Sequence, residues 1–362
     1  MKRWLIILLA AGFCIAAMLR WRELKDFGSQ IFYEYGEADA PDGELFDRMA
    51  EAERSQGNPL PDMAAWTVEE NVEVENRSLP IWIFRSVGRV QKADRMLVWG
   101  DRELAVKRGL AAGNYGYPSD PRACVISRGL AMELFGSYAV VGMEVRCQGT
   151  DYLVRGVTQD DRRMVIVPAS GSSDRFPYVL LDYGADRGAK SGADQLLYRY
   201  DAGSARYRVD GEICLSVAGF FAFLPVWAAL GRSLFEYFVR EKRLLHRLAA
   251  VSAAAVAAAA CIRILGAEET RFPPDLIPSR WSDFSFWGQR WREIAPALRF
   301  AGENGRVLWM TLLRERTTAG ILCGTAGGLT VICNRSDGGI VRKTLLTLRD
   351  KMSKVGGRSK SG

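Results

Sequence analysis

Four apolar stretches with almost no charged residues interrupt an otherwise polar chain, and they constrain its fold more than any other feature. They cover residues 4–19, 213–230, 248–265 and 317–334. An α-helix of about 20 apolar residues crosses the hydrocarbon core of a bilayer. The mean hydropathy is near zero only because the long region after the first stretch is polar. The sequence therefore predicts a membrane protein with four transmembrane helices.

Basic residues gather beside two of these stretches and predict the orientation of the chain. Eight Lys or Arg residues lie between residues 335 and 360, and five lie between residues 232 and 247. Loops rich in Lys and Arg stay on the cytoplasmic side, where anionic lipids also attract them. Both clusters are cytoplasmic if the region after the first stretch is exported. Residues 266–316 then lie outside, although they hold eight arginines and seven acids.

The apolar stretches and their flanks divide the chain into eight predicted parts. In order, these are transmembrane helix 1 (1–21), an extracytoplasmic domain (22–210), transmembrane helix 2 (211–230), a cytoplasmic amphipathic segment (231–247), transmembrane helix 3 (248–265), an external loop (266–316), transmembrane helix 4 (317–334) and a basic cytoplasmic tail (335–362). Such a chain is a multi-pass protein of the cell membrane.

The first and fourth predicted spans leave questions open. The first stretch also fits a cleaved signal peptide, because Lys2 and Arg3 precede it and it is rich in alanine towards its end. Its helical pattern continues as far as Ile31, which favours an uncleaved anchor. The fourth stretch is short, but Gly320 and Gly324 form a GxxxG pair that suits close packing of helices.

An aromatic stripe marks the predicted external loop. Residues at steps of three or four share one face of a helix. The stripe consists of Phe284, Trp287, Trp291, Ile294 and Leu298. A face rich in Trp suits a helix that lies on a membrane surface. Packing on the protein's own domain is an alternative that the sequence leaves open.

Residues 22–210 predict an α+β domain. β-rich runs punctuated by Gly, Asp and Pro follow a short polar helix within residues 41–66. The predicted strands cover residues 81–84, 96–99, 123–126, 143–147, 152–157, 164–167 and 178–181, with a short helix at 129–135. Cys124 and Cys147 are the cysteines of this region, and they could form a disulfide if it lies outside the cell.

The chain lacks the residues of the commonest catalytic and metal sites. His246 is the single histidine, and neither CxxC nor GxxxxGK[ST] occurs. A Ser-His-Asp triad, an HExxH site, a zinc site and a P-loop for ATP are therefore not expected. Asp160, Asp161 and Asp182 could form the carboxylate pair of a hydrolase, but adjacent acids in loops are usually solvated surface. We predict no catalytic residue, metal or cofactor, and no nucleic-acid partner, because no known module for one occurs.

Residues 123–157 hold the most specific pattern in the chain, a strand ending in Ser, a helix with Ala-x-x-Leu-Phe-Gly, and a hairpin. Its key positions are Ser127, Ala131, Leu134, Phe135, Gly136, Gly142, Gly149 and Gly156. Gly136 could cap the helix in the left-handed conformation, and Gly149 lies where the hairpin must reverse. These roles specify a fold, and none is catalytic.

The pattern resembles the extracytoplasmic domain of MacB/FtsX-like ABC transporter permeases. Those domains share the hydrophobic-Ser strand end, the Ala-x-x-Leu-Phe-Gly helix, a Val-Gly pair and a hairpin that ends Val-x-Gly-Val. The predicted order of one span, an external domain and three more spans is similar to theirs as well. The sharp match covers 35 residues, and the order of spans covers nearly the whole chain. The loop at residues 266–316 is longer than this resemblance leads us to expect.

The resemblance implies a non-catalytic transmembrane subunit of an ABC transporter in a bacterial plasma membrane. It implies a separate ABC-type ATPase as partner, and a homodimer or a heterodimer with a second permease, surrounded by membrane lipids. ATP hydrolysis by the partner would then move the external domain, in efflux or in mechanotransmission. The candidate residues for docking the ATPase lie in the segment 231–247 and are Leu234, Phe235, Phe238, Val239 and Arg240.

Two alternatives remain open from the sequence. The segment 231–247 could be a plain juxtamembrane helix lying on lipid. The whole chain could be a membrane-anchored sensor or accessory interaction protein that never transports, because a fold alone does not determine function.

Overall fold

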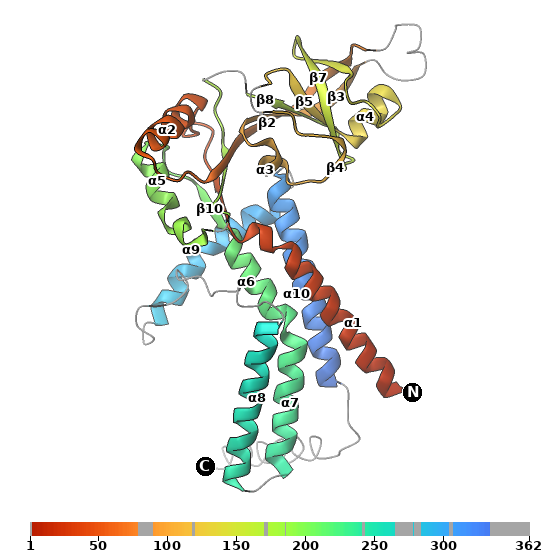
Figure 1. Cartoon of the computed structure of the whole chain (residues 1–362), viewed down its shortest axis with the longest axis vertical. Coiled ribbons are helices and arrows are strands. Elements are labelled where there is room, and N and C mark those ends of the chain that lie inside the picture. The colour runs from red at the N-terminus through yellow and green to blue at the C-terminus, as the bar shows by residue number, and fades with distance from the viewer. Residues whose placement is uncertain are drawn as a thin grey trace, which may run out of the picture. The chain divides into compact units, whose positions relative to one another are not determined.

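The computed structural model describes residues 2–78, 90–117, 120–169, 173–184, 186–240, 243–264, 278, 284–303 and 307–333 (Figure 1). The chain splits into two compact units. The sheet unit comprises Arg20–Ala218 and Thr270–Thr318, and the helical unit comprises Met1–Leu19, Gly219–Glu269 and Ala319–Gly362. The predicted strand at 81–84, the predicted tail at 335–362 and most of the first half of the predicted loop 266–316 lie outside the described residues.

The described part of the sheet unit contains a ten-stranded mixed sheet with short helices beside it (Figure 1). The strands are β1 Gln30–Glu34, β2 Asp62–Asn76, β3 Val90–Gly100, β4 Leu110–Gly113, β5 Ala123–Ser127, β6 Glu144–Cys147, β7 Thr150–Thr158, β8 Met164–Pro168, β9 Tyr178–Asp182 and β10 Tyr207–Asp210. They pair in the order β10-β1-β9-β2-β3-β8-β5-β7-β4, and β6 pairs with β2 and β7. This is an α+β fold, as the sequence predicts.

Strand β1 occupies the place where the sequence predicts the end of the first helix. Helix α1, Lys2–Glu23, is followed by a 3-10 turn, η1, Lys25–Phe27. Ile31 lies in β1 and is paired with Asp210 of β10 and Leu181 of β9. The helical prediction is therefore wrong at Ile31. All residues of β1 are buried, and such a strand shows no alternation of polar and apolar residues that would reveal it.

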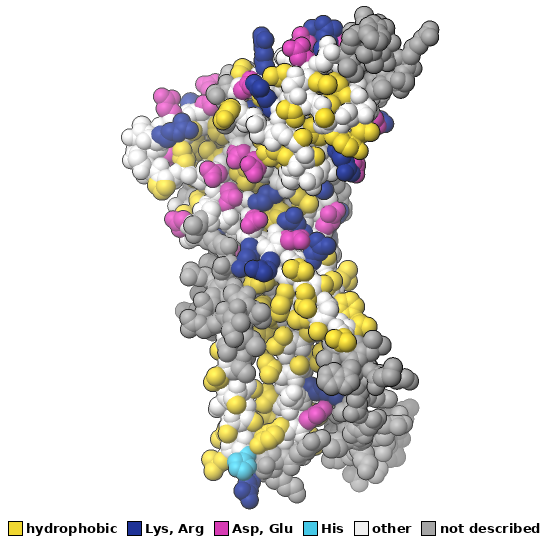
Figure 2. All heavy atoms as spheres, turned by 45° about the vertical axis from the view of Figure 1, so that its right-hand side comes forward, with side chains coloured by type: hydrophobic (Ala, Val, Ile, Leu, Met, Phe, Trp, Pro, Cys, Tyr) yellow, Lys and Arg dark blue, Asp and Glu magenta, His cyan; other side chains and the backbone are white. Residues whose placement is uncertain are grey.

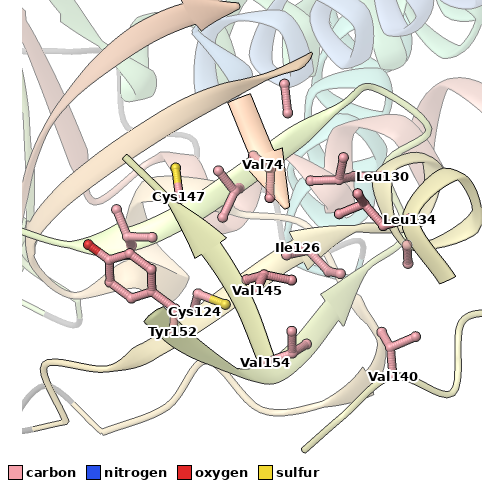
Figure 3. Close-up of a cluster of buried hydrophobic side chains, with 14 of the residues drawn as sticks. Val74, Cys124, Ile126, Leu130, Leu134, Val140, Val145, Cys147, Tyr152 and Val154 are labelled. Carbon is pink, nitrogen blue, oxygen red and sulfur yellow. The ribbon is translucent and has the colours of Figure 1, made fainter. Parts of the chain in front are cut away.

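One buried cluster of the sheet unit lies under helix α4, Arg128–Phe135 (Figure 3). Strands contribute Val74, Ile126, Val145 and Val154 among others, and the helix contributes Leu130, Ala131 and Leu134, with Phe135 packed against the edge. Cys124 and Cys147 lie in this cluster as free thiols. Burial raises the pKa of both thiols, which disfavours the thiolate that disulfide exchange requires.

Helix α4 has its length set by side-chain and backbone contacts at its two ends. The buried Ser127 Oγ accepts a hydrogen bond from the Leu130 N–H at 3.3 Å and one from the Met164 N–H of β8 at 3.0 Å. Ser127 thus caps the helix and fastens it to the sheet. At the other end Gly136 has φ 69°, and its N–H donates to the Met132 carbonyl at 2.9 Å.

The other glycines of the 123–157 pattern also occupy restricted positions. Gly149 (φ 81°) follows Gln148 (φ 48°) in the turn between β6 and β7, where two positive φ values match the twist of a hairpin. Gly142 has φ 88°, and its N–H donates to the Val154 carbonyl. A Cβ on Gly156 would lie 2.4 Å from the Asn114 carbonyl oxygen, so no side chain fits there.

A second buried cluster of the sheet unit lies around α2, Gly43–Gln56, and α5, Ala193–Arg199. Glu53 of α2 joins the two helices, because its carboxylate accepts hydrogen bonds from Asn58 at 2.6 Å, Tyr200 at 2.8 Å and Arg199 at 2.6 Å. Hydrogen bonds from Asn58 and Tyr200 lower the pKa of Glu53. Its contribution to stability is therefore present at neutral pH and is lost as the pH falls through that lowered pKa.

The helical unit holds parts of α1, α6 (Gly211–Ala222) and α10 (Leu308–Cys333), together with α7 (Leu224–Arg240) and α8 (Leu244–Ile264). Helix α7 packs on α8 (Figure 1). Within the described residues, no single helix is both long enough and apolar enough to span a membrane. The pair α6 and α7 meets that condition together, with a bend of 42° between them.

Helix boundaries in this unit differ from the predicted segments. Helix α7 contains both the end of predicted span 2 and most of the segment 231–247. Helix α10 is continuous over 26 residues and begins at Leu308, well before the predicted span 317–334. Arg314, Glu315 and Arg316 do not interrupt it, because charged side chains on a helix surface leave its backbone hydrogen bonds intact.

The described helices of the helical unit expose many large apolar side chains, whereas charged side chains gather on the sheet unit (Figure 2). Leu8, Ile15, Leu245, Val256 and Leu322 are examples, and Leu245 is 79% exposed. Proteins surrounded by water seldom expose apolar surface that extends along several helices. This surface is suited to lipid.

Substituting Ser127→Ala removes the cap of α4 and leaves the buried Met164 N–H without its partner. We expect the free energy of unfolding to fall by about 1–3 kcal/mol, measured by denaturant titration of the full chain in detergent. Ser137→Ala is the matched control, because its exposed hydroxyl accepts a local hydrogen bond from Ala139. Equal stability of the two variants would contradict the role given to Ser127.

Candidate functional site at the base of the sheet unit

The chain enters and leaves the main part of the sheet unit through two adjacent strands. β1 follows α1 and η1, and β10 leads directly into α6. The two strands are antiparallel neighbours, with Ile31 opposite Asp210 and Tyr33 opposite Arg208. The two ends of the domain therefore lie side by side, and we call the residues around this point the base of the sheet unit.

Lys190 connects both chain ends at this base. It lies in the 3-10 helix η3, Arg187–Gly192, and is 4% exposed. Its Nζ donates to the Gly28 carbonyl at 2.8 Å, to Asp210 Oδ1 at 2.6 Å and to Glu212 Oε2 at 3.1 Å. Gly28 precedes β1, whereas Asp210 and Glu212 lie where β10 becomes α6. One buried ammonium group thus holds the entering and the leaving chain together.

The start of α6 is also fixed by direct contact with η1. Asp210 Oδ1 accepts a second hydrogen bond from the Glu212 N–H at 2.9 Å. A Cβ on Gly211 would lie 2.0 Å from the Phe27 carbonyl oxygen. Only glycine allows this approach, so α6 begins in contact with the turn that follows α1.

The N-terminal part of α10 forms a third element of the base. Trp309 is fully buried, and its Nε1–H donates to Gln30 Oε1 at 2.8 Å. Gln30 Nε2 in turn donates to Asp182 Oδ2 at 2.6 Å. The Trp309 ring stacks on Phe32, with centroids 5.4 Å apart, and contacts Phe27 at 5.7 Å. The free-energy cost of burying the polar atoms of Gln30 and Trp309 is offset because they form a hydrogen bond with each other.

Cations surround Phe27 on the same base. The Arg316 guanidinium lies 5.4 Å from the ring centroid, and the Lys107 Nζ lies 4.9 Å from it. Arg316 also donates to the Glu23 carbonyl at 2.9 Å. Burial lowers the pKa of Lys107, and its ammonium donates to the Asp26 carbonyl at 3.1 Å. Contacts of this kind fix α10 to the end of α1.

In the helical unit, the glycines of α10 face the bend between α6 and α7. A Cβ on Gly324 would lie 2.0 Å from the Phe221 carbonyl oxygen, and one on Gly327 would lie 2.8 Å from Pro225 Cγ. Arg232 of α7 donates to the Val331 carbonyl of α10 at 2.9 Å. The helices are thus in backbone contact at the bend, which small residues permit.

The proposed docking residues lie on the C-terminal half of α7. Phe235 and Val239 are exposed, and Leu234 and Phe238 are half-buried. The backbone of Arg240 ends the helix, and its side chain is outside the described residues. Phe235 and Val239 are four residues apart and share one face of the helix.

The acids that suggested a hydrolase have structural partners. Asp161 is paired with Arg128 at 2.7 Å, and Asp182 accepts from Ser29 and Gln30. Burial raises the pKa of Asp160, but hydrogen bonds from Arg162 outweigh this and hold the pKa below its usual value. Asp160 is therefore ionised at neutral pH and unsuited to be a general acid. Among the described residues no group of His, Cys, Asp and Glu could hold a metal ion.

Sequence reasoning did not find Lys190, Gln30 or Trp309. Lys190 lies in a loop rich in Gly, Ala and Ser, where a lysine is usually solvated. Gln30 lies within the run that the prediction assigned to the first helix, because that run was extended to Ile31. For Trp309, the apolar run from residue 307 to 313 before the fourth stretch was a signal, because an apolar run outside a membrane span must be buried elsewhere.

No family model matches the chain, and no curated protein matches it. Solved structures that are similar to part of it include the following two. The extracellular domain of the noncanonic ABC-type transporter YknZ from Gram-positive bacteria aligns with 49% of this chain and 97% of that one, at 17% identity and a TM-score of 0.35. The periplasmic region of MacB from Actinobacillus actinomycetemcomitans aligns with 52% of this chain and 91% of that one, at 12% identity and a TM-score of 0.38.

Both structures are extracytoplasmic domains. They are domains of the kind that residues 123–157 resemble in their sequence pattern. At 17% and 12% identity the likeness concerns the fold alone.

Substituting Lys190→Met leaves Asp210 and Glu212 buried without their counter-ion. We expect a loss of about 3–5 kcal/mol in the free energy of unfolding, measured in detergent by denaturant titration with near-UV circular dichroism. Lys92→Met, at an exposed position of β3, is the control and should change little. The triple variant Lys190→Met, Asp210→Asn, Glu212→Gln should recover part of the loss. A triple variant as unstable as the single one would contradict the ionic explanation.

Substituting Gly324→Leu forces a side chain into the Phe221 backbone. We expect thermal unfolding in detergent at a markedly lower temperature, because overpacking costs about 1–3 kcal/mol or more where backbone must move. Gly231→Leu is the matched control, since a Cβ there meets no atom within 4 Å and Leu favours the helix. If both variants unfold at the same temperature, α10 does not pack at the bend as described.

Proposed function

We propose that this chain is the transmembrane subunit of a MacB/FtsX-type ABC transporter. It sits in a bacterial plasma membrane with residues 22–210 outside and the C-terminus inside. A separate ATPase hydrolyses ATP, and the chain couples that reaction to movement of the extracytoplasmic domain. It acts as a homodimer or with a second permease, and it is not itself an enzyme. The outcome of the movement is efflux or mechanotransmission.

The observation that carries the proposal is the base of the sheet unit. The two helices that flank the external domain in sequence, α1 and α6, are joined to it at neighbouring strands and bridged by Lys190. A domain attached in this way moves as a body when these helices shift, because the connections are short and buried. An enzyme would instead need reactive groups that converge on a cavity, and the three acids that suggested a hydrolase, Asp160, Asp161 and Asp182, have structural partners.

The helices themselves support a role in transmission. Helix α10 provides Trp309 and Arg316 to the base of the sheet unit, and Gly324 and Gly327 to the bend in the helical unit. A continuous helix of 26 residues is about 39 Å long and stiff on this scale. The proposal places four membrane helices in the chain, at α1, α6 with α7, α8 and α10, because these contain the four apolar stretches of the sequence.

The ATPase would dock on the exposed apolar residues of α7. Phe235 and Val239 present an apolar face beside the basic cluster that orients this end to the cytoplasm. In the absence of a P-loop, ATP hydrolysis must come from another chain. A helix face with anchors at steps of three and four fits a hydrophobic groove on such a partner.

The test is to purify the full chain through a C-terminal tag in mild detergent and to identify what copurifies. We expect a stoichiometric P-loop ATPase with ATP hydrolysis in the complex. Phe235→Asp with Phe238→Asp should abolish both, because charges cannot enter an apolar groove. Tyr198→Asp, an exposed aromatic position on α5 of the sheet unit, is the control and should retain the ATPase. A folded chain that brings down no ATPase would overturn the proposal.

A second function is favoured by a cavity of about 950 Å³ in the sheet unit. Arg54, Trp99, Arg102 and Tyr117 are among its lining residues, a mixture of charge and aromatic surface that suits a polar ligand. The chain would then be a membrane-anchored sensor. A ligand that binds the purified chain in the absence of any ATPase would favour the sensor over the transporter.

A further inference from the structure

Helix α9, Phe284–Glu303, belongs to the sheet unit and presents an aromatic face. Trp287 is 42% exposed and Trp291 is 65% exposed. The two are four residues apart and lie on the same side of the helix. None of the described side chains of α9 is fully buried. The helix therefore lies on the surface of its unit, with its largest apolar groups outward.

One contact fixes the C-terminal end of α9 to the base of the sheet unit. The Phe300 ring stacks on Tyr207, with centroids 4.7 Å apart and an interplanar angle of 25°, and α9 packs along β10. At 100° per residue, Phe300 lies about 180° around the helix from Trp291 and about 140° from Trp287. The face of α9 that contacts Tyr207 and the face that carries the tryptophans are thus nearly opposite.

The anchor point is close to the start of the bent pair α6 and α7. Tyr207 is the first residue of β10, and Gly211 is the first residue of α6. Four residues of strand span about 13 Å. Since α6 begins the pair that satisfies the length and hydropathy of a membrane span, the end of α9 is held at the level where that span would leave the bilayer.

The charges of α9 flank its tryptophans. Arg290 lies 5.6 Å from the Phe286 ring centroid, and the exposed Arg292 and Arg299 lie on the other side of the stripe. Tryptophan prefers the headgroup level of a bilayer, because its ring is apolar and its N–H can meet water or phosphate. Arginine beside such a ring pairs with lipid phosphate. Both residue types favour the same environment.

We propose that α9 lies on the outer surface of the bilayer, with Trp287 and Trp291 inserted at the level of the lipid headgroups and the flanking arginines on lipid phosphates. The proposal rests on the membrane location in the proposed function. In this proposal, the long external segment binds the membrane surface and holds the base of the sheet unit against it, beside the candidate span. A helix of 20 residues, about 30 Å long, provides a broad contact.

The test uses the full-length chain in vesicles of phosphatidylcholine and phosphatidylglycerol, with part of the phosphatidylcholine brominated high on its acyl chains. Bromine quenches tryptophan only at short range. The variant is Trp287→Gln with Trp291→Gln, and the control is Trp99→Gln in the sheet unit. Because two of the ten tryptophans are removed, we expect bromine-quenched emission to fall by up to about a fifth in the double variant and not in the control.

Two results would overturn the inference. In the first, the double variant loses emission that aqueous iodide quenches and bromine does not, which would place both tryptophan rings in water. In the second, the lost emission is inaccessible to bromine and iodide alike, which would indicate a protein partner on this face. The variant Trp227→Gln in α7 distinguishes these results from a failure of the proposed function. If bromine-quenched emission falls neither in this variant nor in the double variant, the chain is not in the bilayer. If it falls in Trp227→Gln but not in the double variant, only the placement of α9 is overturned.

Discussion

The buried ion cluster of Lys190, Asp210 and Glu212 is the interaction on which the arrangement of the sheet unit depends. Removing an ammonium group from water costs several kcal/mol, and this cost is offset only when carboxylates and a carbonyl surround it closely. Lys190 contacts two carboxylates and the Gly28 carbonyl. Gly28 lies more than 150 residues before the other partners in the chain. The Gly28 carbonyl reaches Lys190 only when both ends of the domain are together. The cluster specifies one geometry for the strands β1 and β10 that connect the domain to its helices.

Around this cluster, each further contact at the base joins an element that leads away from the domain. Gly211 lets α6 begin against the Phe27 carbonyl, and Trp309 locks α10 to Gln30 and Phe32. Trp309 contacts the rings of Phe27 and Phe32, and Gln30 links it by hydrogen bonds to Asp182. A base built in this way resists independent movement of its parts. The proposed role in transmitting displacement would require such stiffness.

The helical unit follows a different physical rule. Among its described residues, glycines of α10 contact the bend between α6 and α7, and Arg232 donates to the Val331 carbonyl, while many large apolar side chains are exposed. In water this surface would be unfavourable, and in lipid it is not, since lipid tails are as apolar as leucine. Gly324 and Gly327 of α10 lie against residues at the bend between α6 and α7. Backbone contact there replaces the side-chain interlocking that a soluble bundle would use.

The sequence by itself determined the features that local pattern controls. The apolar stretches predicted helical segments, although the helix boundaries differ, and the run 129–135 followed by Gly136 predicted α4 and its left-handed C-terminal cap. Local rules suffice there, because a cap, a left-handed glycine and a hairpin turn depend only on neighbouring residues. The same positions carried the resemblance to the MacB/FtsX-like domain.

Only the tertiary structure decided which distant residues meet. Strand β2 was not predicted, although its second half alternates valine with glutamate as half-buried strands do. Only the structure shows that it pairs with β3, β6 and β9. The strand β1 looked helical because burial on both faces removes the alternation that marks a strand. Lys190 looked like a surface residue, because its burial depends on two carboxylates that the fold brings to it. Long-range pairing and buried charge are properties of the assembled chain, and no window of sequence contains them.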